Sequence, residues 1–132
     1  MRGVLRDPAR QHGLPHRRRA ARAVRGVAGA AEPTGQEPAS ELAARGRSVL
    51  ETTACASCHT VVGTSASGDV GPDLTHVASR DRIAAETIPN DIGHMADWIS
   101  NSQTVKPGNL MPPQPLSPQD LRAVVTYLQG LE

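Results

Sequence analysis

Two cysteines three positions apart, with a histidine directly after the second, limit this chain more than any other feature. The run is Cys55-Ala56-Ser57-Cys58-His59, and it holds the only cysteines of the chain. This spacing suits covalent haem attachment, because both thiols can add to the vinyl groups of one porphyrin edge. The following residue then lies beneath the iron, where an imidazole nitrogen can bind it. The motif predicts one covalent c-type haem on Cys55 and Cys58, with His59 as the proximal iron ligand.

A cysteine pair at this spacing has two other common uses. A thiol redox couple needs a βαβ surround, and a zinc site needs two further ligands at finger-like spacing. The sequence shows neither pattern around Cys55 and Cys58. We therefore favour haem, with a thiol couple or a structural pair as the alternatives.

Composition agrees with a cofactor that completes the core. The chain has 132 residues, 2% aromatic residues and no phenylalanine. A domain this small buries little apolar surface of its own and usually needs a cofactor, a metal or disulfides to stabilise it. A flat apolar porphyrin would supply the missing apolar surface. No run of 18 apolar residues is present, so the sequence predicts no membrane span.

The distribution of charge divides the chain near Ala39. Residues 1–38 hold eight arginines against three acidic residues, net +5, whereas residues 39–132 hold six basic and ten acidic residues, net −4. The first segment lacks hydrophobic periodicity and is predicted to be disordered. Arg17-Arg18-Arg19 weakly resembles a twin-arginine export signal, although Arg22 and Arg25 interrupt the apolar stretch. A nucleic-acid-binding arm is disfavoured, because no aromatic residue interleaves the arginines.

Residues 39–132 show helical periodicity, which predicts an all-α domain. A first helix is expected from about Ser40 to Thr52, with an apolar face at positions 42, 46, 49, 50 and 53. A last helix begins after Ser117, with proline at its first position, and closes at Gly130. A glycine inside an apolar helix face is tolerated where another backbone comes close. We therefore predict that the two terminal helices cross, with Tyr127 near Gly46.

Shorter elements are expected between these helices. Asp73 is predicted to cap one or two helical turns over Pro72–Ala78. Asn90 or Asp91 is predicted to cap a short helix that carries Met95, Trp98 and Ile99 on one side. No alternating run longer than four residues indicates a strand.

An iron bound by His59 needs a sixth ligand, and a methionine thioether favours a low-spin iron that is closed to substrates. Met111 stands in the proline-rich segment Pro107–Pro113, which is too rich in proline for a helix and rigid enough to hold a thioether against a metal. We predict Met111 as this ligand. Met95 is more typical of a core residue, and the remaining alternatives are His76, His94 or an open site.

Several stretches of the chain together match a known family. They are Ala44-Arg45-Gly46-Arg47, the haem motif with Thr60-Val61, residues 70–80, Ile83-Ala84-Ala85, Trp98-Ile99 and residues 105–112. From Arg45 to Leu131 the chain resembles the class I cytochrome c fold. It most closely resembles the C-terminal haem domain of some bacterial cytochrome c oxidase subunit II proteins. The resemblance implies crossing terminal helices around the haem.

The resemblance also implies roles for single residues. Cys55 and Cys58 would hold the porphyrin, and His59 and Met111 would bind the iron. The Pro72 carbonyl would accept the N–H of the proximal imidazole. Trp98 would pack against the haem and reach a propionate. Arg80 would be another propionate partner, with a surface ion pair as the alternative.

The function implied is single-electron transfer, as the entry module of a terminal oxidase rather than as an enzyme by itself. Its partners would be a cytochrome c-type donor and an oxidase copper centre, with no nucleic acid. The alternatives are a free periplasmic cytochrome c carrier, or a haem enzyme or gas sensor with a labile sixth ligand. Because bacteria attach haem c outside the cytoplasmic membrane, we expect a location in the periplasm or on that side of the membrane.

The sequence departs from the family in three respects. Leu50 stands where phenylalanine is usual, and Glu86 stands where glycine is expected. A subunit II protein also has two membrane helices and a copper domain, yet residues 1–38 contain no cysteine that could bind copper. We therefore expect a truncated or mis-started product of a larger gene.

Overall fold

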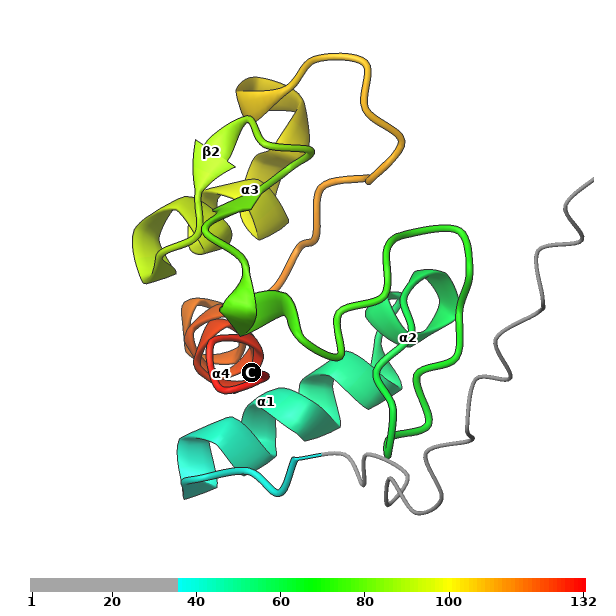
Figure 1. Ribbon diagram of the computed structural model, residues 1–132, viewed down its shortest axis with the longest axis vertical. Coiled ribbons are helices and arrows are strands. Elements are labelled where there is room, and N and C mark those ends of the chain that lie inside the picture. The colour runs from blue at the N-terminus through cyan, green and yellow to red at the C-terminus, as the bar shows by residue number, and fades with distance from the viewer. Residues whose placement is uncertain (1–35) are drawn as a thin grey trace, which may run out of the picture. The chain divides into compact units, whose positions relative to one another are not determined.

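The computed structural model describes residues 36–132. Predictions about the arginine-rich segment fall almost wholly outside these residues and stay predictions. The described part is mainly helical, and two very short strands pair beside α3 (Figure 1). Its elements in chain order are α1 (Glu41–Thr52), α2 (Cys55–Cys58), a 3₁₀ turn (Val77–Ser79), β1 (Arg82–Ile83), β2 (Ile88–Pro89), α3 (Ile92–Val105) and α4 (Pro118–Leu128). No helix within residues 36–132 is long and apolar enough to cross a membrane.

Helix α1 begins where the sequence predicts. The Ser40 hydroxyl oxygen accepts a hydrogen bond from the backbone N–H of Ala43 at 3.1 Å, which caps the helix. The face buried in the domain consists of Ala43, Gly46 and Leu50, whereas Leu42 is only half-buried. Two of these three inward residues, Ala43 and Gly46, are small, which lets a second helix approach closely.

That second helix is α4. Pro118 is its first residue, and the Ser117 hydroxyl oxygen accepts from the N–H of Asp120 at 3.1 Å. A β-carbon at position 46 would lie 2.5 Å from the carbonyl carbon of Ala123 and 2.8 Å from Cβ of Tyr127. Only glycine permits this approach, so the predicted crossing of α1 and α4 beside Gly46 and Tyr127 is confirmed.

Helix α3 is longer than the short helix expected. It begins at the N-cap Asp91, whose carboxylate accepts from the N–H of His94 at 2.9 Å, and it continues to Val105. Asn101 departs from helical backbone angles and kinks the helix. Met95 and Ile99 face inward, which agrees with the predicted apolar side.

The segment between α2 and α3 contains one predicted turn and one unpredicted hairpin. Asp73 accepts from the N–H of Thr75 at 2.8 Å, but the helical turn that follows is a short 3₁₀ turn. The hairpin pairs β1 with β2 in antiparallel register. Its strands have two residues each, too few to produce an alternating pattern in the sequence.

Candidate cofactor site

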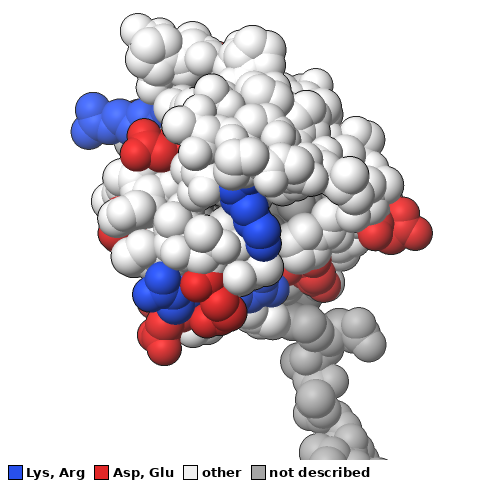
Figure 2. Space-filling view, turned by 90° about the horizontal axis from the view of Figure 1, so that it is seen from above, with Lys and Arg blue, Asp and Glu red and all other residues white. Residues whose placement is uncertain are grey.

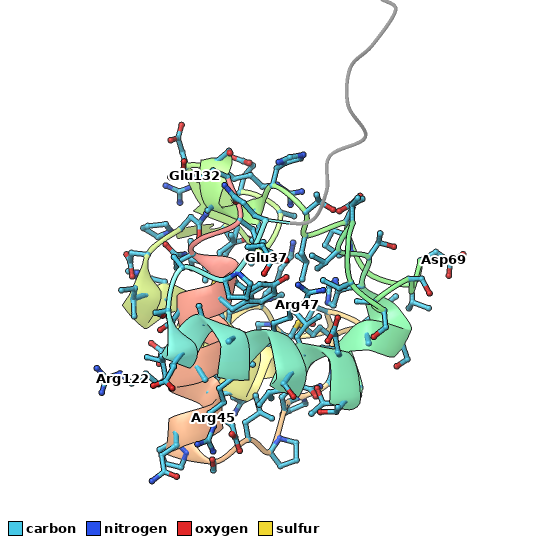
Figure 3. The ribbon with its side chains drawn as sticks, turned by 90° about the horizontal axis from the view of Figure 1, so that it is seen from below. Glu37, Arg45, Arg47, Asp69, Arg122 and Glu132 are labelled. Atoms are coloured by element: carbon cyan, nitrogen blue, oxygen red, sulfur yellow. The ribbon has the colours of Figure 1, made fainter. Side chains whose placement is uncertain are left out.

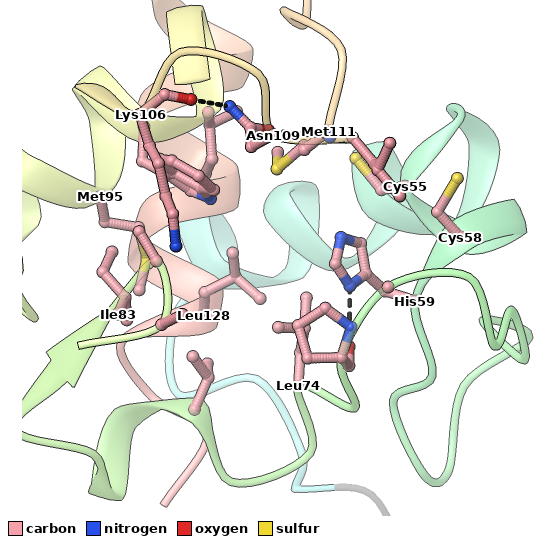
Figure 4. A pocket seen from close by; sticks show the side chains of 18 of the residues that line it. Cys55, Cys58, His59, Leu74, Ile83, Met95, Lys106, Asn109, Met111 and Leu128 are labelled. Carbon is pink, nitrogen blue, oxygen red and sulfur yellow. Dashed lines mark hydrogen bonds between the residues drawn. The ribbon is translucent and has the colours of Figure 1, made fainter. Parts of the chain in front are cut away.

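A cavity of about 490 Å³ lies between α2, α3, the hairpin and the loop that follows α3 (Figure 4). Its lining is mainly apolar and includes Leu74, Ile83, Ile99 and Leu128. All seven residues predicted for the site line it: Cys55, Cys58, His59, Pro72, Arg80, Trp98 and Met111. The fold thus brings together residues that lie up to 56 positions apart in the sequence.

Helix α2 positions the two cysteines. It is a single turn, so residues three apart lie on the same side of it, and both Cys55 and Cys58 line the cavity. Both thiols are free and half-buried. Two thiols on one helical turn at the edge of an apolar cavity can anchor one flat molecule at two points.

His59 directly follows α2 and is held by its neighbours. Its backbone N–H donates to the Cys55 carbonyl at 2.9 Å, and Nδ1 of its ring lies 2.7 Å from the Pro72 carbonyl oxygen. A carbonyl can only accept, so Nδ1 is the donor, and in the neutral ring Nε2 then keeps its lone pair. Figure 4 shows this second nitrogen directed into the cavity. The ring is therefore oriented as a metal-binding imidazole needs to be.

Gly71, for which no role was predicted, also shapes this contact. A β-carbon at position 71 would lie 2.5 Å from Cε1 of His59 and 2.7 Å from its Nδ1. The N–H of Gly71 donates to the Cys58 carbonyl at 2.6 Å. The sequence did offer a signal for this contact. Gly71 stands immediately before Pro72, and glycine commonly marks a place where the backbone comes close to another group.

Met111 reaches the cavity from the loop after α3. Its N–H donates to Oδ1 of Asn109 at 2.8 Å, and its carbonyl accepts from the Ser102 hydroxyl at 2.5 Å. Gln103 donates to the same carbonyl at 3.3 Å. The backbone at Met111 is therefore fixed on both sides, and its thioether shares the cavity with the His59 ring (Figure 4).

The other candidates for a sixth ligand have different surroundings. Met95 also lines the cavity, but it is 2% exposed and its sulfur accepts a hydrogen bond from Gln129 at 3.7 Å. Neither His76 nor His94 belongs to the lining of the cavity. The His76 ring contacts the Glu132 carbonyl at 2.7 Å, and the His94 ring pairs with Asp91 at 2.6 Å.

Trp98 and Arg80 complete the set expected from the sequence. Trp98 is half-buried on α3 and lines the cavity. Arg80 is exposed at the rim, where its guanidinium donates to the Asp73 carbonyl at 2.7 Å. Hydrogen bonds from the Thr75 hydroxyl and N–H lower the pKa of the Asp73 carboxyl, so that carboxyl stays ionised beside the cavity.

These residues fit a haem. The cavity offers two thiols at one edge, an imidazole with a free nitrogen, a thioether and mainly apolar walls. Within residues 36–132 no three His, Cys, Asp or Glu side chains gather as ligands for a bare metal ion. The donor set and the apolar walls therefore suit an iron porphyrin better than a simple ion.

Comparison with known proteins agrees with this chemistry. Residues 43–132 match the cytochrome c family, and the chain belongs to that family. Over 98 residues the chain is 38% identical to cytochrome c oxidase subunit 2 of Alkalihalophilus pseudofirmus, an alignment that covers 74% of this chain and 28% of that protein. The chain thus spans little more than a quarter of that relative's length. The resemblance seen in the sequence is confirmed.

A solved structure is also similar. It is the c-type cytochrome SorU from Sinorhizobium meliloti, with 22% identity, a TM-score of 0.48, and coverage of 68% of this chain and 90% of that one. Membership of the cytochrome c family establishes the predicted all-α cytochrome c fold and implies haem c and haem-based electron transfer.

Proposed function

We propose that this chain transfers single electrons through one haem, attached at Cys55 and Cys58 and ligated by His59 and Met111. One observation carries the proposal. The His59 ring, held by its hydrogen bond to a carbonyl, and the Met111 thioether, whose backbone is held by hydrogen bonds, enter the same apolar cavity beside two free thiols. Haem held by these residues would supply an Fe(II)/Fe(III) couple.

The residues of the chain would then have two tasks: they position the two iron ligands, and they keep water out of the cavity. The Pro72 carbonyl fixes the His59 ring, and Ser102 with Asn109 fixes the Met111 backbone. Side chains held in this way would move little when the iron changes oxidation state. A small movement favours rapid electron exchange. Trp98 covers one wall and limits the access of water.

The role in a larger assembly is a further part of the proposal. The similarity to an oxidase subunit 2 supports an electron-entry module, with a cytochrome c-type donor and a copper centre as acceptor. Such a module would work on the periplasmic side of the cytoplasmic membrane. A free periplasmic carrier would use the same cavity and differ only in its acceptor.

Production of the full chain with an export signal and haem-attachment machinery tests the haem assignment. The product should be red and low-spin, and its haem should survive extraction with acid acetone. The double variant Cys55→Ala with Cys58→Ala should lose the covalent haem. Haem that stays bound through denaturation in that variant would overturn the attachment site.

The acceptor is tested separately. The reduced chain should pass electrons to a soluble dinuclear-copper domain of an oxidase subunit II, measured by stopped flow. Rapid oxidation by another soluble cytochrome, with no transfer to the copper domain, would favour the free carrier.

A further inference from the structure

Three cationic side chains line the cavity, although the domain around it is acidic. They are Arg80 and Arg82, which lie two residues apart at the start of the hairpin, and Lys106, which directly follows α3. Residues 36–132 carry eleven acidic and six basic side chains, so half of the cations gather at one cavity. Glu86 is the one acidic residue in its lining. Figure 2 shows a Lys or Arg side chain lying in a hollow of an otherwise largely uncharged face.

None of these three cations has a carboxylate partner within residues 36–132. The arginines that form ion pairs lie elsewhere, Arg45 with Asp120 at 2.8 Å and Arg47 with Glu51 at 3.4 Å. The guanidinium groups of Arg80 and Arg82 donate instead to backbone carbonyls. Arg80 and Arg82 are exposed and can be solvated by water, whereas a half-buried cation at this cavity gains more from an anion that completes the site.

Lys106 is the cation most in need of such an anion. It is half-buried, and its ammonium forms no hydrogen bond or ion pair with any residue of the described part. Figure 4 shows its side chain extending into the cavity on the side away from Cys55 and Cys58. A haem fixed by its vinyl edge at the cysteines would bring its two carboxylates to another edge.

We propose that the Lys106 ammonium binds a propionate carboxylate of the attached haem, an inference that rests on the proposed function. Lys106 also begins the turn that carries Met111. Its carbonyl accepts from Nδ2 of Asn109 at 2.7 Å, and Oδ1 of Asn109 accepts from the N–H of Met111. Binding of the propionate therefore holds this turn in place, and Lys106 is a positioning residue for the Met111 thioether.

Substitution in the full haem-bearing chain tests this role. Lys106→Gln removes the cation, and ferric haem carries one more positive charge than ferrous haem. The equilibrium constant for reduction by a redox dye should fall roughly fivefold. The absorption band of thioether-bound ferric haem should disappear at a lower guanidinium concentration. Lys106→Arg should recover most of both properties. The matched control is Arg122→Gln, which removes an equal charge from a side chain that points away from the domain (Figure 3).

Chemical labelling gives a second measurement that needs no variant at position 106. Lys106 is the only lysine in the chain, so acylation at this residue can be followed by mass spectrometry, with the amino terminus as internal reference. Attached haem should slow the acylation of Lys106 several-fold relative to the haem-free Cys55→Ala, Cys58→Ala chain.

The outcomes separate the two proposals. If the unsubstituted chain takes up no covalent haem, the proposed function fails. If haem attaches normally but Lys106→Gln behaves as Arg122→Gln does, the role of Lys106 is overturned alone. Equal acylation with and without haem overturns it as well, even if Lys106→Gln fails to fold.

Discussion

The thioether of Met111 is positioned by hydrogen bonds to its backbone, which come from Asn109, Ser102 and Gln103. Met111→Ala keeps those backbone bonds and removes only the sulfur. We expect the variant to lose the weak long-wavelength band of thioether-bound ferric haem and to bind carbon monoxide when reduced. Optical spectra of both oxidation states measure these changes.

Met95 supplies the matched control, because it is a second methionine of the same cavity. Met95→Leu conserves volume and should leave the band intact, with a loss of stability below about 1.5 kcal/mol. Loss of the band in this variant, with retention in Met111→Ala, would assign the ligand to Met95.

Glu86 occupies a backbone conformation that suits glycine. Ala84, Ala85 and Glu86 have φ angles of 54°, 53° and 64°, all in the left-handed region. Arg82 steadies this turn by donating to the carbonyls of Glu86 and Thr87 at 2.9 and 3.0 Å. The turn therefore forms with Glu86 where glycine is expected from the family, and the positive φ angle of Glu86 lowers the stability of the fold.

Glu86→Gly should therefore raise the free energy of unfolding by about 1 kcal/mol, because glycine adopts positive φ without strain. Urea unfolding followed by circular dichroism measures the change. Asp97→Gly, on the exposed face of α3, should lower stability by about the same amount. A destabilised Glu86→Gly protein would show that the side chain matters more than the strain.

Among the elements, the crossing of α1 and α4 depends on a single missing side chain. Gly46→Ala would force its β-carbon against the Ala123 carbonyl, which is backbone and cannot move aside easily. We expect a loss of about 2–4 kcal/mol in the free energy of unfolding. Gly93→Ala is the control, because its β-carbon would meet only Oδ1 of Asp91 at 3.4 Å. A small effect of Gly46→Ala would mean that the two helices separate without loss.

The start of α4 should be sensitive to acid. Hydrogen bonds from Ser117 and then Arg45 lower the pKa of the Asp120 carboxyl below its ordinary 3.8. A lowered folded-state pKa adds stability that is complete above the unfolded-state pKa and is lost as pH falls through the folded-state value.

Asp120→Asn should therefore unfold more easily at neutral pH and lose less stability between about pH 5 and pH 2. Thermal melts across that range measure this. Asp69→Asn, on an exposed loop, should follow the unsubstituted chain. Parallel pH profiles for Asp120→Asn and the unsubstituted chain would contradict this account of the cap.

Helices with clear chemical boundaries were predictable from the sequence, and short elements were not. Ser117 caps α4 as predicted, Asp91 is the one of its two candidates that caps α3, and Ser40, expected at the start of the first helix, is its N-cap. The full length of α3 was missed, because Val105 is the only apolar residue in its last turn and gives no helical periodicity there. That the cysteines, the histidine and the methionine share one cavity was predictable from chemistry and resemblance, and their roles toward haem stay predictions. The direction of the Lys106 side chain, which extends into the cavity, is set by tertiary packing and could not be predicted from local sequence patterns.

For the molecule as a whole, charge should govern encounter with partners. Residues 36–132 carry net −5, and two haem propionates would add negative charge. Electron transfer from a basic cytochrome c should therefore slow as ionic strength rises, with little dependence left near about 0.5 M salt. Stopped-flow mixing measures the rate, with a small neutral reductant as control. A rate that is flat or rises with salt would favour docking through apolar residues at the cavity, such as Val70 and Leu110, which are 72% and 91% exposed.

The two ends of the described domain meet in space. The N–H of Glu132 donates to the side chain of Gln36 at 3.2 Å, and α1 and α4 form the most extensive contact between helices. Folding must therefore close a loop that spans nearly the whole domain before its main helix pair can form, a step that carries a large entropic penalty. Residues 55–59 lie inside this loop. A porphyrin bonded there early would gather the residues around it, so cofactor attachment and chain collapse would be kinetically linked in this architecture.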